Sequence, residues 1–137
     1  MFLEPLACLA MAIYFEARGE PTVGQIAVAH VIMNRVESDD FPNTVCGVVT
    51  QGKTYTSNPE MPVRHKCQFS FYCDGLSDVP KDKRAWNKAI RIAEEVQYTY
   101  GLSIPLLDGA VFYHAISVDP KWRREYITQI EDHIFYK

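Results

Sequence analysis

The chain has 137 residues, of which 47% are hydrophobic and 23% charged, and its formal net charge at pH 7 is −3. This length fits one ordinary domain with a sizeable core, and the composition excludes an intrinsically disordered chain. The charge shows no basic excess, so it gives no support for nucleic acid as a partner.

The N-terminal segment is apolar, but no run of about 18 apolar residues occurs in the chain, so the sequence predicts no membrane span. The segment lacks a basic start and contains Glu4 and Pro5, so we interpret it as part of the mature fold and not as a signal peptide. Its apolar residues recur at spacings of three and four, which predicts an amphipathic helix over residues 3–18. Gly19 and Pro21 are expected to end this helix.

A second helix is predicted over about residues 23–38, where Thr22 and Gln25 form a capping-box pattern. Apolar residues occupy two of its faces, so we expect this helix in the middle of the domain. His30 and Asn34 lie one turn apart on it and are expected to form a polar pair.

The sequence pattern in the middle of the chain predicts two helices and one strand. A short helix is predicted over residues 44–51, and the polar residues 53–66 with their two prolines are expected to form an exposed loop. The stretch "CQFSFYCDG", residues 67–75, alternates between apolar and polar side chains, which favours a strand. A long amphipathic helix is predicted over about residues 80–100, closed by Gly101.

The C-terminal part predicts β structure. "GAVFYHA", residues 109–115, is a short apolar strand candidate, and "YITQIEDHIFY", residues 126–136, is typical of a hairpin with its turn at Glu131–Asp132. The predicted fold is therefore α+β and mainly helical, with a small β element and a C-terminal hairpin.

The four cysteines leave several pairings open. Cys8 lies in an apolar helical stripe and is expected to be a buried thiol. Cys46, Cys67 and Cys73 allow a disulfide between two of them, free thiols, or a zinc site completed by His65. Their spacing is not one of the common structural zinc patterns, so a disulfide is favoured over zinc and no metal or cofactor is predicted.

Glu16 is an acid on the apolar side of the first helix. It follows Ile13 by three residues and Leu9 by seven, positions that stack on one helical face. Burial and the nearby helix C-terminus both disfavour the charged carboxylate, so we expect a raised pKa. An acid that is still protonated near neutral pH can donate a proton to a leaving group. The alternative is an ordinary helix-end acid paired with Arg18.

Several sequence blocks together resemble a known family. "AIYFEARGEPTVGQIAVAHVIMNRV", "FPNTVCGVV", "CQFSFYCDG", "GAVFYHA" and "HIFY" occur in this order over roughly residues 6–136. They resemble the SleB/CwlJ-type cell-wall hydrolases, a family known for spore-cortex-lytic enzymes and also found in phages. The resemblance implies one domain over residues 1–137 with a lysozyme-like, lytic-transglycosylase fold that acts on peptidoglycan. It also implies that Glu16, the first glutamate of "EARGE", is the catalytic acid.

The resemblance implies a route with a single acid. Glycosidases usually use two carboxylates, and neither Glu20 nor Asp74 is a convincing second one. We therefore expect Glu16 to protonate the glycosidic oxygen between N-acetylmuramic acid and N-acetylglucosamine, and then to take the proton of the muramic C6 hydroxyl as a 1,6-anhydro ring closes. Glu20 is expected to support the turn by pairing with Arg18, Arg35 or backbone amides.

Four further residues are candidates for binding the sugar chain. Gln68 and Ser70 are expected on one side of the predicted strand, where they either contact a sugar or face solvent. Tyr113 and His114 combine an aromatic ring with a polar ring, which suits a sugar, although a buried and satisfied His114 is the alternative. Residues assigned to packing are Tyr14, Trp86 and Trp122.

Other functions stay open at this stage. The same bond can be hydrolysed with water by a muramidase. A zinc amidase needs three metal ligands, and the four histidines show no local ligand motif. A non-catalytic wall-binding module of a virion would have no use for a buried acid. Since the family often carries a signal peptide and a separate wall-binding module, neither of which this sequence shows, we expect a monomeric, phage-type enzyme that is made in the cytoplasm and acts on the wall.

Overall fold

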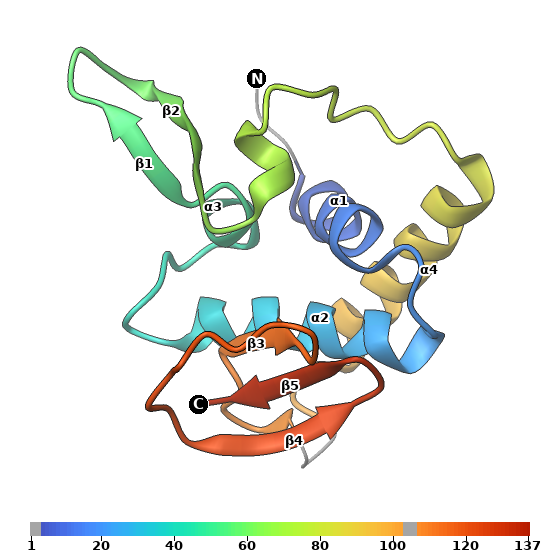
Figure 1. The fold of residues 1–137 in the computed structure, drawn as a ribbon. Helices are drawn as coiled ribbons and strands as arrows, with labels where there is room; N and C mark the ends of the chain where they lie inside the picture. The colour runs from blue at the N-terminus through green and yellow to red at the C-terminus, as the bar shows by residue number, and fades with distance from the viewer. Residues whose placement is uncertain (1–3, 103–106) are drawn as a thin grey trace.

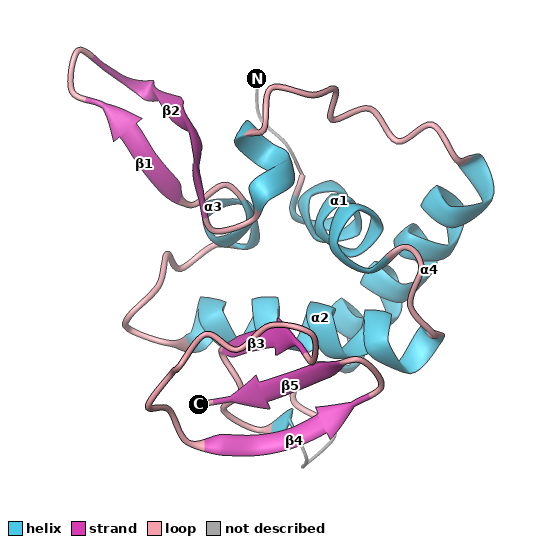
Figure 2. Cartoon of the chain, viewed as in Figure 1, coloured by secondary structure: helices cyan, strands magenta, loops and turns pink. Residues whose placement is uncertain are grey.

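The computed structural model describes residues 4–102 and 107–137 and confirms an α+β fold that is mainly helical. The central helix α2 lies between the other helices and a small C-terminal sheet, and a separate hairpin extends away from them (Figure 1; Figure 2). The helices are α1 (Pro5–Ala17), α2 (Thr22–Glu37), α3 (Val45–Val49) and α4 (Lys83–Thr99), with a short 3-10 helix over Ser70–Cys73. The strands are β1 (Gly52–Tyr55), β2 (Asn58–Cys67), β3 (Phe112–Ala115), β4 (Tyr126–Ile130) and β5 (His133–Tyr136). None of the described helices is long and apolar enough to cross a membrane.

Helix α2 has two apolar faces, as the sequence predicts. On one face, Val28, Ala29 and Ile32 pack in the main core with α1, α3 and α4. On the other face, Ala27 and Val31 pack in a second cluster that includes residues of the C-terminal sheet. Because both faces are buried, α2 links the helices to the sheet, and this fixes the position of the polar residues near its end.

Helix α4 begins slightly later than predicted. Asp82 caps its N-terminus by accepting a hydrogen bond from the backbone amide of Ala85 at 3.1 Å. The buried hydroxyl of Tyr14 accepts hydrogen bonds from the amides of Lys81 and Asp82. Tyr14 is therefore part of the core, as expected, and it also anchors the entry to α4 on α1.

The prediction of a loop over residues 53–66 is wrong. The structure has an antiparallel hairpin there, in which Gly52 pairs with Cys67 and Thr54 with Pro62. The side chains of β1 and most of those of β2 are exposed, so the strands carry no alternation of buried and exposed residues that a sequence pattern could reveal. The prolines are tolerated because both strands of an isolated hairpin are edge strands.

The predicted strand over residues 67–75 is also wrong. Strand β2 ends at Cys67, and a disulfide joins Cys67 to Cys73 with their Cα atoms 6.2 Å apart. An extended strand would place residues six apart at about 20 Å. The disulfide thus requires a turn, which the 3-10 helix supplies.

The second disulfide corrects the prediction for Cys8. Cys8 is buried, but it is not a thiol, because it is bonded to Cys46 and so ties α1 to α3. The predicted disulfide among the other three cysteines is confirmed by Cys67–Cys73. All four cysteines are paired, which excludes the zinc site. Elsewhere in the described ranges, no three His, Cys, Asp or Glu side chains gather where they could hold a metal ion.

The C-terminal hairpin is confirmed. Strands β4 and β5 pair antiparallel, and β3 adds to the other edge of β5. The turn contains Glu131 with a φ of 50°, so the chain adopts the left-handed conformation there without a glycine. Tyr113 pairs with the buried Phe135 on the face toward α2, and strand alternation turns His114 to the other face.

Candidate active site

Glu16 lies at the wall of a cavity of about 400 Å³. The cavity is bounded by the end of α1, the end of α2, the segment after β2, strand β3 and the loop between β3 and β4. Among the described residues that line it, Glu16 is the only carboxylate. The full lining consists of Glu16, Arg35, Gln68, Phe69, Phe112, Tyr113, Trp122 and Arg124.

The Glu16 carboxyl has an unusual proton affinity. Burial raises its pKa from the ordinary 4.5 to about 7, and the nearby Arg35 guanidinium opposes this rise. The predicted direction of the pKa shift is therefore confirmed, with burial as its main cause. With a pKa near 7, Glu16 populates both protonation states around neutral pH. Such a group can serve both as a proton donor and as a proton acceptor.

Arg35 is the residue of this cavity that the sequence reasoning missed as a partner of Glu16. Its side chain is buried, its Nε donates a hydrogen bond to the Val111 carbonyl at 2.7 Å, and burial lowers its pKa. The sequence did contain one signal for this role: Arg35 is a charged residue in the last turn of a helix that is apolar nearly all round. Its guanidinium carbon lies 4.9, 5.5 and 5.6 Å from the ring centroids of Phe41, Phe69 and Phe112.

The two candidates on strand β3 have different surroundings. Tyr113 lines the cavity, and burial, with a further contribution from Glu16, raises the pKa of its hydroxyl. His114 is not among the lining residues: its ring lies against Tyr136, and its Nε2 is 2.7 Å from the Tyr136 hydroxyl. Its Nδ1 is 2.8 Å from the Ala115 carbonyl oxygen. The structure thus places Tyr113 beside Glu16 and gives His114 partners of its own.

The two candidates after strand β2 also separate. Gln68 lines the cavity, and its backbone amide donates to the Gln51 carbonyl at 3.0 Å, which fixes this segment to the base of the hairpin. Ser70 begins the 3-10 helix and does not line the cavity. The expectation that Gln68 and Ser70 share one side of a strand is wrong, because the disulfide at Cys67 turns the chain between them.

Glu20 has a partner that the sequence did not suggest. Its carboxylate lies 3.5 Å from the His133 ring on β5, and neither Arg18 nor Arg35 forms an ion pair with it in the described structure. Arg18 donates instead to the Tyr14 hydroxyl. Glu20 does not line the cavity of Glu16. Its place between the α1–α2 turn and β5 indicates a structural contact between helices and sheet.

Trp122 differs from the expectation that it is a packing residue. It lines the cavity with 39% of its surface exposed, and its ring makes edge contacts with Phe112, His114 and Tyr136. Trp86 does pack as expected, edge-on to Tyr14 near the core. An exposed tryptophan on a cavity wall is a suitable platform for a sugar ring.

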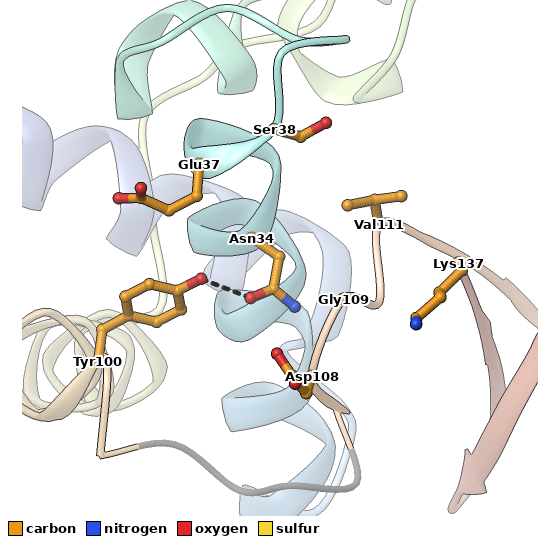
Figure 3. Close-up of a pocket in the computed structure, with 8 residues that line it drawn as sticks. All are labelled: Asn34, Glu37, Ser38, Tyr100, Asp108, Gly109, Val111 and Lys137. Atoms are coloured by element: carbon orange, nitrogen blue, oxygen red, sulfur yellow. Dashed lines mark hydrogen bonds between the residues drawn. The ribbon is translucent and has the colours of Figure 1, made fainter.

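A second cavity of about 380 Å³ lies near the C-terminal end of α2 and is lined by Asn34, Tyr100 and Asp108, among others (Figure 3). Two of its polar groups bind each other: the Tyr100 hydroxyl donates to the Asn34 Oδ1 at 2.6 Å. The Asn34 amide nitrogen donates to the carbonyls of Leu107 and Ala110, so the predicted pair of His30 and Asn34 is wrong. The carboxylates here, Glu37 and Asp108, are exposed, unlike Glu16. This cavity is therefore the weaker candidate for acid catalysis.

The fold and the site define a class of protein. The model of the cell wall hydrolase family matches residues 19–136, so the chain belongs to that family of enzymes. The match begins three residues after Glu16.

Two solved structures resemble the chain over nearly its whole length. The catalytic domain of the Bacillus cereus SleB protein is similar to this chain with a TM-score of 0.61 and 30% sequence identity. The alignment covers 97% of this chain and 89% of the Bacillus cereus chain. The catalytic domain of the germination-specific lytic transglycosylase SleB from Bacillus anthracis is similar to this chain with a TM-score of 0.68 and 29% sequence identity. The alignment covers 100% of this chain and 97% of the Bacillus anthracis chain. The SleB-type resemblance and the predicted fold are thereby confirmed.

Curated relatives match a shorter segment. The spore cortex-lytic enzymes of Bacillus cereus and Bacillus subtilis (strain 168) are 55% and 53% identical to this chain over 49 residues, which make up 36% of the chain. This segment is 19% of the Bacillus cereus relative and 16% of the Bacillus subtilis relative. The chain thus matches less than a fifth of the length of these proteins.

Proposed function

We propose that this protein cleaves the glycan strands of peptidoglycan between N-acetylmuramic acid and N-acetylglucosamine, as a lytic transglycosylase with Glu16 as its single acid and base. The observation that carries the proposal is a partly buried carboxyl with a pKa of about 7 on a cavity wall that has no second acid among its described residues. A two-carboxylate mechanism requires a second carboxyl about 5–9.5 Å from the first.

The proposed reaction uses the two protonation states of Glu16 in turn. The protonated carboxyl donates its proton to the glycosidic oxygen, and the bond from this oxygen to the muramic C1 breaks. The muramic C6 oxygen then bonds to C1 and releases its own proton to the Glu16 carboxylate. The proton count of the enzyme is restored, no water is consumed, and the product carries a 1,6-anhydro ring.

Arg35 has a specific part in this cycle. After the first proton transfer, Glu16 is a carboxylate in a poorly solvated place, which is costly without a nearby cation. The guanidinium of Arg35 lowers that cost, and its hydrogen bond to Val111 holds it in place. Burial therefore keeps the acid protonated before the reaction, and Arg35 makes its ionised form accessible during the reaction.

The descriptions of the relatives agree with this proposal, which itself rests on the site. One structural relative is described as a germination-specific lytic transglycosylase, and the curated relatives as spore cortex-lytic enzymes. The two disulfides favour a place of action outside a reducing cytoplasm, which fits the bacterial wall. Action as a monomer and delivery by a phage-type route remain predictions.

Mass spectrometry of digested peptidoglycan tests the proposal. Wild-type protein should release fragments with 1,6-anhydro-muramic ends, and Glu16→Gln, which keeps the shape but cannot cycle a proton, should release none. Reducing muramic ends would instead show a muramidase that uses water. Wall lysis by Glu16→Gln at the wild-type rate would contradict any role of Glu16 as the acid. Activity that is lost with a chelator would favour the zinc amidase.

A further inference from the structure

The cavity of Glu16 carries more positive than negative charge. Two arginines, Arg35 and Arg124, line it together with one carboxylate that is only partly ionised near neutral pH. The whole chain, in contrast, has a net charge of −3. Positive charge is thus concentrated at this cavity, and an anionic group of the ligand would be attracted to it.

Arg35 and Arg124 differ in what holds them. Arg35 is buried and hydrogen-bonds the Val111 carbonyl, so its charge acts on Glu16. Arg124 is exposed in the loop between β3 and β4, and no acidic side chain of the described residues forms an ion pair with it. The acid beside it in sequence, Glu125, pairs with Lys137 instead. The Arg124 guanidinium is therefore available to a ligand.

The geometry prepares this guanidinium for a planar anion. Its central carbon lies 3.5 Å from the centroid of the Phe112 ring and 5.8 Å from that of the Trp122 ring. Stacking on an aromatic face restricts the guanidinium, whose planar fork matches a carboxylate with two parallel hydrogen bonds. The adjacent Trp122 is partly exposed on the same cavity wall, where a sugar ring can stack.

Glycosidic bond cleavage alone does not explain a second cation here. Its transition state resembles an oxocarbenium ion, so positive charge develops at the sugar and a nearby cation opposes it. In a peptide-bearing strand the sugars are uncharged, because the lactyl carboxyl of each muramic acid is bound in the amide to its stem peptide. The free carboxylates of the substrate are in the stem peptide, which is attached to the lactyl group of the muramic acid and projects from the glycan.

We propose that Arg124 binds a free carboxylate of the stem peptide, so that this protein cleaves strands whose peptides carry free carboxylates in preference to strands whose peptide carboxylates are neutral. The inference rests on the proposed function, because it assigns a substrate preference to the same cavity. Arg124 acts in it as a specificity residue at the rim, while Glu16 carries out the proton transfers.

The test compares two forms of one substrate. Purified peptide-bearing glycan strands are used as they are or after carbodiimide coupling to excess ammonia has turned their free carboxylates into neutral amides, and kcat/KM is measured for both at low ionic strength. Wild-type protein should prefer the strands with free carboxylates by about fivefold, the size of one rim ion pair. Arg124→Gln, whose flat amide can still stack on Phe112, should lose this preference by slowing only on the strands with free carboxylates. Arg124→Lys should keep part of it.

The matched control is Arg123→Gln, which removes the same charge from an exposed neighbour that does not line the cavity. It should keep the wild-type preference. Increasing salt should reduce the wild-type preference without changing cleavage of the strands with neutralised carboxylates. This salt dependence tests the inference even where a variant at Arg124 fails to fold.

Distinct results would overturn the inference. These are a wild-type protein without a preference, a preference that salt does not change, equal losses of Arg124→Gln on both substrates, or the same loss in Arg123→Gln. Each leaves the proposed function intact, because the strands are still cleaved. Absence of glycan cleavage on both substrates by wild-type protein would contradict the proposed function itself, and this inference with it.

Discussion

Replacement of Glu16 by glutamine should make the protein inactive and, above neutral pH, more stable. A glutamate with a folded-state pKa of about 7 binds its proton more tightly in the folded than in the unfolded chain, where the pKa is about 4.5. Between these values the folded state holds more protons, so the contribution of Glu16 to stability falls as the pH rises. Glutamine has no proton to lose, and this loss of stability disappears in the variant.

The magnitude follows from the shift. A difference of about 2.5 pKa units at 1.36 kcal/mol each corresponds to about 3 kcal/mol, reached progressively between about pH 4.5 and pH 7.5. The difference in unfolding free energy between Glu16→Gln and wild type should therefore grow by about 3 kcal/mol from pH 4 to pH 8. Because Glu16 is partly exposed, this figure is an upper value.

Urea unfolding of both proteins at several pH values, with the disulfides kept intact, measures this difference. Glu94→Gln, an exposed glutamate of α4, is the matched control and should show no comparable growth. A difference between Glu16→Gln and wild type that stays constant from pH 4 to pH 8 would refute the reasoning. Glu16 would then ionise as an ordinary carboxyl, and the physical basis for its role as an acid would be lost.

Three further predictions concern Arg35 and the two disulfides. The cleavage rate should fall as the pH rises through about 7, and Arg35→Met should move this fall to higher pH, because the cation that favours the carboxylate is gone; a move to lower pH in the pH–rate profile would contradict this role. Replacement of Cys8 and Cys46 by alanine should lower the unfolding free energy by about 4 kcal/mol, since the disulfide closes 38 residues, and urea unfolding checks it. The Cys67–Cys73 disulfide closes only 6 residues, so replacing both cysteines by alanine should lower the unfolding free energy by only about 2 kcal/mol. This change should nevertheless reduce the cleavage rate more than the change at Cys8 and Cys46, because it loosens the turn at the cavity. Equal effects of the two disulfides on the cleavage rate would argue against this.

The helices could be predicted because their sequences record which side is buried. Helix α2 shows this best: the two apolar faces found by spacing are the two faces that pack, one in the main core and the other in the second cluster with residues of the sheet. The β1–β2 hairpin could not be predicted in the same way. Its strands bury little, so their residues were not selected for an alternating pattern, and a polar segment with two prolines looks the same as a loop.

The turn after β2 was missed for a different reason. The alternation of "CQFSFYC" is real, but the bond between Cys67 and Cys73 overrides it, and a pairing of cysteines is a fact of three-dimensional distance. For the same reason the partner of Cys8 could not be read from the sequence: Cys46 is 38 residues away and becomes its neighbour only when α3 packs on α1. Local patterns do not contain such contacts.

The candidate site shows the same division between local and distant information. The raised pKa of Glu16 could be argued from its own helix, because the cause is burial on an apolar face. The opposing effect of Arg35 could not, because it depends on how the end of α2 lies against α1. Burial alone would leave a carboxyl that holds its proton, and a cation alone would leave an ordinary carboxylate. A single group that must first give a proton and then take one needs both states within reach, and the two effects together hold its pKa at about 7.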